Sequence, residues 1–131
     1  MHDLGTGEAR IHRHATNHKA LRAGLETMGL EYIPDHSLTT LNAVHVPEGV
    51  DDALVRGRLL NEFGIEIGAG LGPFKGKAWR IGLMGHSSSQ RNVVLLVSAL
   101  EALLNEQGYS LAKGAALAAV SQTYQQAEKD A

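Results

Sequence analysis

The sequence predicts an α+β fold, a two-layer sandwich in which a small, mainly antiparallel sheet of three to four strands is covered by helices. Of the 131 residues 44% are hydrophobic, which is enough to form a core. Helical and strand-like patterns follow one another along the chain, and each helical stretch has one apolar side that can cover a sheet. The length fits a single domain, residues 1–131.

The expected elements follow from the spacing of apolar residues and from the turn residues between them. Helices are expected over residues 8–28, 51–63, 87–104 and 110–120. Strands are expected over residues 30–33, 39–46 and 79–84, with a short apolar segment at 65–67. The residues placed to start or end the helices are Gly29, Asp51, Asp52, Gly64 and Gly108, and Ser110 is expected to cap the last helix. Ser87 and Gln90 match a capping box that opens a helix, and the polar tail after Val120 is expected to fray.

Composition excludes several classes of protein. A net charge of -2 argues against a nucleic-acid partner, which usually needs a basic face. The absence of cysteine excludes disulfides, thiol nucleophiles and cysteine-type zinc sites. No apolar run of about 18 residues is present, and the first residues lack the apolar core of a signal peptide. We therefore expect a cytoplasmic protein with no membrane partner.

The glycine-rich loop from Gly68 to Lys77, GAGLGPFKGK, resembles a phosphate-binding loop but lacks its spacing. The position that needs the first glycine is Leu71, and Ala78 stands where a phosphate loop has Ser or Thr. The dinucleotide fingerprint would need a glycine at Lys75. The loop also leads into a strand, whereas a phosphate loop opens a helix. We therefore expect a tight turn here and no nucleotide site.

Seven histidines raise the question of a metal site. His14 and His18 share a helix face with His12 near them, but no H-E-x-x-H arrangement and no third ligand is evident, so no metal is expected. His86 follows the last strand and either faces a site or lies in a structural turn. The serines at 87–89 lack the G-x-S-x-G context of a hydrolase, and helix capping explains them.

Arg80 is a charged residue inside an otherwise apolar strand, WRIGLM. Because side chains alternate along a strand, Arg80 is expected on the face opposite Trp79 and Ile81. An arginine in this position either lies on a solvated face or is aimed at an anion, since its guanidinium is a rigid fork that matches a carboxylate. The pattern alone leaves both interpretations open.

Residues 63–93, FGIEIGAGLGPFKGKAWRIGLMGHSSSQRNV, resemble the C-terminal small domain of alanine–glyoxylate (serine–pyruvate) aminotransferases. These enzymes are class V members of the fold-type I group that uses pyridoxal 5'-phosphate (PLP). The specific motifs are I-E-I-G-x-G-L-G-P and G-K-x-W-R-I-G-L-M-G. Residues 17–33 and 39–60 are similar to the family's first helix and strand of this domain and to its next strand and helix. The resemblance covers about residues 8–120.

The resemblance implies a role for Arg80, the binding of the α-carboxylate of the amino acid or keto acid. It also implies that the loop Gly70–Leu71–Gly72 lies near this substrate site. It assigns no role to His86, and it implies no catalytic, cofactor-binding or metal-binding residue in this chain.

The resemblance also implies what this chain lacks. In the family the PLP-binding large domain, with its Schiff-base lysine, is a separate domain that these 131 residues do not contain. The five lysines here do not match the Schiff-base context, so we expect no covalent PLP binding and no activity from this chain alone. The intact enzyme is expected to be a homodimer that transfers an amino group from alanine or serine to glyoxylate or pyruvate, with PLP as the electron sink.

Two other interpretations remain open at this stage. The chain could be a stand-alone, non-catalytic α+β module that binds a small carboxylate or has a regulatory role. It could also be the same domain of another class V enzyme with a different amino donor, since residues of the small domain do not define the donor.

Overall fold

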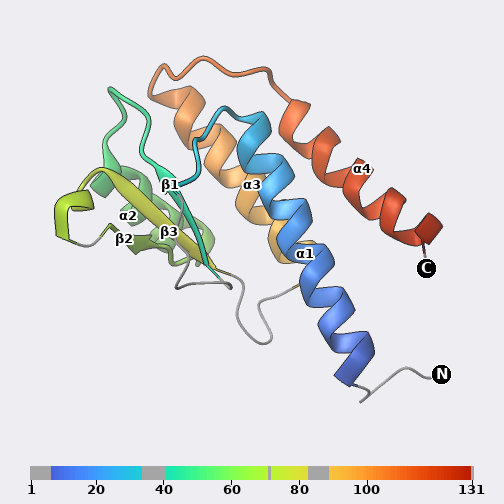
Figure 1. The fold of residues 1–131 in the computed structure, drawn as a ribbon. Helices are drawn as coiled ribbons and strands as arrows, with labels where there is room; N and C mark the ends of the chain where they lie inside the picture. Colours follow the sequence, from blue (N-terminus) through green and yellow to red (C-terminus); the bar gives the residue numbers. More distant parts are fainter. Residues whose placement is uncertain (1–6, 34–40, 71, 83–88, 131) are drawn as a thin grey trace.

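The computed structural model of the protein describes residues 7–33, 41–70, 72–82 and 89–130. The helices are α1 (Gly7–Thr27), α2 (Asp52–Phe63), α3 (Gln90–Glu106) and α4 (Ala115–Asp130), with a 3-10 turn, η1, at Gly72–Phe74 (Figure 1). The strands are β1 (Leu41–His45), β2 (Gly68–Ala69) and β3 (Ala78–Gly82). The predicted α+β fold is confirmed. No helix in the described ranges has the length and apolar character needed to cross a membrane.

The sheet is antiparallel, with three strands in the order β1-β3-β2. In the central strand, Arg80 is in register with Ala43 of β1 on one side and with Gly68 of β2 on the other. The strand expected at residues 30–33 is reduced to an isolated bridge between Tyr32 and Val44. Figure 1 shows α2 behind this sheet, which gives the two layers that the sequence predicts.

One face of the sheet belongs to the core. Val44, Trp79 and Ile81 are fully buried there, as expected for residues that share a face through the two-residue period of a strand. Val55 and Leu59 of α2 are buried in the same cluster. The opposite face carries Arg80, so the alternation predicted from WRIGLM is confirmed.

The other helices pack closely on one another. The α1 helix runs beside α4 and crosses α3 in Figure 1. A β-carbon added at Gly24 of α1 would lie 3.0 Å from the side chains of both Val97 and Val120. Gly24 therefore allows α3 and α4 to approach α1 closely, and any larger side chain would have to push them apart.

The start and end of α2 agree with the sequence. Asp51 is the N-cap, and its Oδ1 accepts a hydrogen bond from the Leu54 amide at 3.1 Å. Gly64 ends the helix in the left-handed conformation with φ at 67°, which glycine adopts without steric cost.

The last two helices differ from the prediction. The N-cap of α3 is Ser89, whose Oγ accepts from the Asn92 amide at 3.1 Å, so Gln90 is the first helical residue and not the third of a capping box. Ser87 lies outside the described residues. The α4 helix begins five residues after Ser110 and continues to residue 130, where fraying was expected. Packing on α1 stabilises this additional length, which a local pattern does not reveal.

A buried carboxylate stabilises the start of α4. Glu101 of α3 is 8% exposed, and its Oε1 accepts a hydrogen bond from the Gly114 amide at 2.8 Å. The first amides of a helix have no partner within the helix, so this contact satisfies a donor that would otherwise need water. It replaces the cap that the sequence suggested at Ser110.

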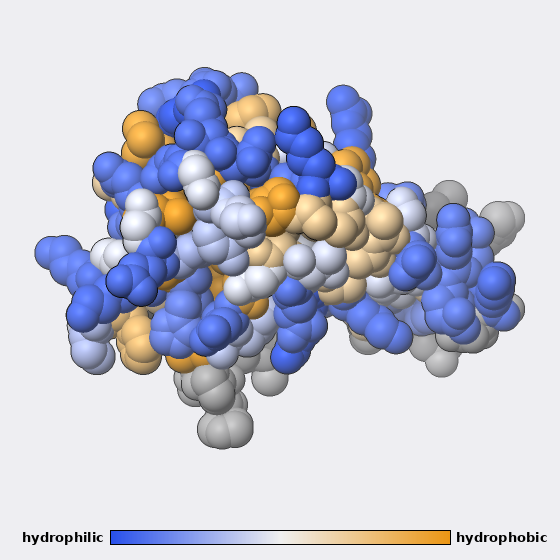
Figure 2. All heavy atoms as spheres, turned by 90° about the horizontal axis from the view of Figure 1, so that it is seen from above, coloured by the Kyte–Doolittle hydropathy of each residue, from blue (hydrophilic) through white to orange (hydrophobic). Residues whose placement is uncertain are grey.

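The outer surface is mainly polar on the face shown in Figure 2, where hydrophobic side chains appear in small groups between hydrophilic ones. The large apolar side chains that stay exposed among the described residues are Leu54, Leu60, Phe74, Val94 and Leu95. They come from α2, η1 and α3. Apolar residues scattered in this way are normal on a protein surface and do not by themselves define an interface.

Candidate functional site

Arg80 lies in the middle of the sheet, on the face opposite the core. Its neighbours across the strands, Ala43 and Gly68, have the two smallest side chains available. No side chain of these two flanking positions can therefore extend over the guanidinium. The sheet presents a partly buried cation at its centre.

The guanidinium of Arg80 is held at one edge. Its Nε donates a hydrogen bond to the backbone oxygen of Ala69 at 2.8 Å. No carboxylate in the described parts of the chain forms an ion pair with it. The donors on its two Nη atoms match the geometry of a carboxylate, so the arrangement can bind a small organic acid.

The loop between β2 and β3 folds back sharply on itself. Gly70 is buried, and a β-carbon there would lie 2.1 Å from the backbone oxygen of Phe74, so only glycine fits. Gly72 has φ at +56°, a left-handed conformation that favours glycine. Leu71 lies outside the described residues. The tight turn predicted for this loop is confirmed, and its two glycines have steric reasons to be there whether or not they also contact substrate.

At one end of the face that carries Arg80, Phe74 of the η1 turn lies against His45. Their ring centroids are 6.3 Å apart and the rings are tilted by 57°. By alternation His45 shares its face of the sheet with Ala43 and Arg80. The turn therefore places an aromatic side chain on the same face of the sheet as the cation.

The sequence interpretation missed a polar contact on the core side of β3. The indole Nε1 of Trp79 donates to Oδ1 of Asp52 at 2.7 Å, and Nε of Arg56 donates to the same oxygen at 2.8 Å. Hydrogen bonding from Arg56 holds the pKa of Asp52 below its ordinary value, with the Trp79 contact acting in the same direction and burial opposing both. The available signal was the i, i+4 pair of an acid and an arginine in the helix. This contact ties the strand that carries Arg80 to the first turn of α2.

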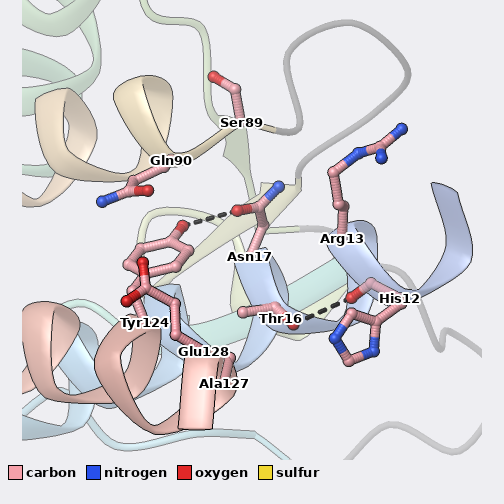
Figure 3. Close-up of a pocket in the computed structure, with 9 residues that line it drawn as sticks. All are labelled: His12, Arg13, Thr16, Asn17, Ser89, Gln90, Tyr124, Ala127 and Glu128. Atoms are coloured by element: carbon pink, nitrogen blue, oxygen red, sulfur yellow. Dashed lines mark hydrogen bonds between the residues drawn. The ribbon is translucent and has the colours of Figure 1, made fainter. Parts of the chain in front are cut away.

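A separate pocket of about 540 Å³ opens between α1, the start of α3 and the end of α4 (Figure 3). In Figure 3 the hydroxyl of Tyr124 points toward Asn17, to whose Oδ1 it donates a hydrogen bond of 2.6 Å. Burial raises the pKa of Tyr124 to about 12. His12, Arg13 and Glu128 are polar residues of its wall. None of the lining residues belongs to the sheet, so this pocket is not part of the Arg80 site.

The described residues form neither a metal site nor the surroundings that a Schiff-base lysine needs. Within the described ranges no group of three or more His, Asp or Glu could hold a metal ion. His86 lies outside these ranges. The lysines are all described and all exposed, at positions Lys19, Lys75, Lys77, Lys113 and Lys129. A lysine that forms a Schiff base needs a pocket that lowers its pKa, so these positions do not fit PLP attachment.

Comparison with known proteins gives the class. No protein-family model matches the sequence. The chain is 40% identical over 126 residues to (S)-ureidoglycine–glyoxylate transaminase of Bacillus subtilis, covering 95% of this chain and 30% of that protein. The crystal structure of this enzyme superimposes on 90% of the chain, and on 31% of its own, with a TM-score of 0.83.

Two further relatives agree. Pyridoxamine–pyruvate aminotransferase of Mesorhizobium loti has 33% identity and a TM-score of 0.80 over 95% of this chain and 32% of its own. Alanine–glyoxylate aminotransferase of Drosophila melanogaster is 35% identical over 71% of this chain and 24% of its own length. The chain is thus homologous to one part of these transaminases. It belongs to the class V aminotransferase family and spans about 24–32% of the length of the relatives it matches.

Proposed function

We propose that this chain is the C-terminal small domain of a PLP-dependent aminotransferase and that Arg80 binds the α-carboxylate of its substrates. The observation that supports the proposal is the place of the Arg80 guanidinium. It is fixed by Ala69, flanked by Ala43 and Gly68, and has no ion-pair partner in the part of the chain that the structure describes. A cation in these surroundings favours an external anion over an internal one.

The chemistry of transamination needs such a group. The amino acid and the keto acid of each half-reaction carry a carboxylate next to the reacting carbon. Two hydrogen bonds to this carboxylate fix the reacting carbon in position and orientation, which lowers the entropy cost of the reaction. Within this proposal, the function of Arg80 is to orient the substrate, and PLP held by the rest of the protein supplies the electron sink.

We further propose glyoxylate or pyruvate as the amino acceptor and alanine or serine as the donor. The names of the relatives pair an amine with glyoxylate or pyruvate, which supports the acceptor. Their donors differ, being ureidoglycine, alanine and pyridoxamine, so the donor rests on the sequence resemblance alone. The homodimer and the cytoplasmic location expected from the sequence remain predictions.

The test is Arg80→Ala in the intact protein, with the half-reaction with alanine measured by the change in the PLP spectrum. A charged hydrogen bond contributes about 1.5–3 kcal/mol, so kcat/KM should fall by at least about tenfold to a hundredfold. Arg80→Lys should rescue little of this loss, because an ammonium group cannot reproduce the planar fork.

The control is PLP binding, which Arg80→Ala should leave unchanged because Arg80 is assigned to the substrate. An arginine on a solvated face would change stability by only about 0.5 kcal/mol and leave the kinetics unaltered. If Arg80→Ala with an unchanged PLP spectrum reacts with alanine as fast as the parent, the carboxylate role is wrong. The substrate carboxylate would then be bound by another group of the intact protein.

A further inference from the structure

We infer that Gly68 and the backbone oxygen of Ala69 orient the Arg80 guanidinium so that only its two Nη atoms face the substrate, which binds end-on. The inference rests on the proposed function, because it assumes that Arg80 binds a carboxylate. It assigns a positioning role to β2, two residues that the sequence interpretation had placed only within a turn.

The guanidinium lies against the backbone of Gly68. A β-carbon added there would be 3.1 Å from Nη2, 3.3 Å from Cζ and 3.3 Å from Nε of Arg80. Three atoms of the planar group are thus nearly equidistant from one point, which means that the plane lies over the position that a β-carbon of residue 68 would take. Any side chain at this position would occupy the space that the guanidinium uses.

The backbone oxygen of Ala69 fixes the rotation of the same plane. Nε has a single hydrogen, and it is donated to Ala69 at 2.8 Å. A carboxylate can engage a guanidinium through Nε and one Nη, or through both Nη atoms. The first arrangement would require Nε to leave Ala69, so the bound carboxylate is restricted to the second.

The place of β2 at the edge of the sheet explains how a strand of two residues can position the Arg80 guanidinium. β2 has two residues and lies at the edge of the sheet, paired only with β3. Gly68 supplies the surface under the guanidinium and Ala69 the acceptor at its edge. Both residues of the strand therefore contact the one side chain that the proposed function depends on.

The first test is Gly68→Ala in the intact protein, with Gly57→Ala as the matched control. The added methyl group would displace the end of a flexible side chain by a few tenths of an ångström, so the fold should survive. Misplacing a binding group by 1 Å can cost about a hundredfold, so we expect KM for alanine and pyruvate to rise about tenfold with a smaller change in kcat. At Gly57 in α2 an added β-carbon meets nothing within 4 Å, and KM should stay at the parent value.

A double-mutant cycle separates a positioning role from a general loss of structure. In the Arg80→Ala background, Gly68→Ala should have no further effect on KM, because there is no guanidinium left to displace. A tenfold effect that persists in that background would overturn the inference. If Arg80→Ala itself has no effect, the proposed function fails. If Arg80→Ala impairs the reaction but Gly68→Ala leaves KM unchanged, the positioning role fails while the proposed function stands.

The second test observes the guanidinium directly. In the protein labelled with 15N-arginine, the Arg80 Nε–H resonance, assigned by its loss in Arg80→Ala, should exchange slowly with water. Addition of pyruvate should shift the Nη resonances and leave the Nε resonance in place. A large shift of Nε on addition of pyruvate would mean that Nε leaves Ala69 for the ligand, and end-on binding would be refuted.

Discussion

Replacing Asp52 with alanine should destabilise the protein by about 2 kcal/mol, most of it through Trp79. The indole of Trp79 is fully buried, and Asp52 Oδ1 accepts its Nε1 hydrogen at 2.7 Å. A buried donor that loses its acceptor costs about 1–3 kcal/mol. The ion pair with Arg56, whose side chain is 32% exposed, adds only about 0.3–0.5 kcal/mol because solvent screens it.

Two variants separate these contributions. Arg56→Met removes the ion pair and leaves the acceptor for Trp79, so it should cost about 0.5 kcal/mol. Asp52→Asn keeps an acceptor oxygen but loses the negative charge at the start of α2, which is a loss of about 0.3–1 kcal/mol, and it weakens the ion pair with Arg56 as Arg56→Met does. The expected order of destabilisation is therefore Asp52→Ala first, with the other two well below it.

The assay is urea unfolding of this chain, followed by the fluorescence of Trp79, which is its only tryptophan. The midpoint should fall at an unchanged m-value, which indicates a change in stability alone. Because the pKa of Asp52 is lowered from 3.8 in the folded protein, its contribution is present above that pH and is lost as the pH falls through the folded value. If Asp52→Ala costs no more than Arg56→Met at neutral pH, the buried indole does not depend on this acceptor.

Gly70→Ala should destabilise the protein by about 2–3 kcal/mol, because its β-carbon would lie 2.1 Å from the backbone oxygen of Phe74 and overpack the loop. At Gly72 an added β-carbon would meet no atom within 4 Å, so Gly72→Ala should cost only about 1 kcal/mol, through the positive φ of this residue. Urea unfolding measures both variants, and a larger loss of stability in Gly72→Ala than in Gly70→Ala would contradict this reasoning. Burial raises the pKa of Tyr124 from 10.0 to about 12, so the stability due to its neutral phenol is present below pH 10 and is lost as the pH rises toward 12. The difference in unfolding free energy between the parent and Tyr124→Phe should shrink over this range, and a constant difference would argue against burial of the phenol.

Local features of the sequence were sufficient for the four helices, for β1 and β3, and for the face on which Arg80 lies. They did not predict β2, and they predicted a strand at residues 30–33 where the structure has an isolated bridge. The order of helices and strands follows from apolar spacing and from turn residues, which act over a few positions. The side of the sheet that Arg80 occupies follows from the two-residue period of WRIGLM. The loop before it was predicted as a tight turn, and the steric limit at Gly70 confirms that prediction.

The helix boundaries show where local signals fail. The polar stretch after Val120 has little apolar pattern, yet α4 continues to residue 130. Tyr124 in this stretch donates a hydrogen bond to Asn17, which is 107 residues away in the sequence. Ser89 caps α3 although Ser87 and Gln90 matched the capping box, because each of the three consecutive serines could serve as the N-cap of the helix. Tertiary contacts select among such alternatives.

The sequence by itself determined the family, the kinds of element and the identity of the cation at the centre of β3. Only the tertiary structure decided what surrounds this cation. Arg80 is separated by 37 residues from Ala43 and by 12 from Gly68, and no local rule gives the register that pairs them. The register of β1 with β3 is fixed by burying Val44 beside Trp79 on the other face, since a shift of β1 by one residue would turn Val44 into solvent. The hydrogen bond from Nε to Ala69, which orients the guanidinium, depends on the register of β2 with β3.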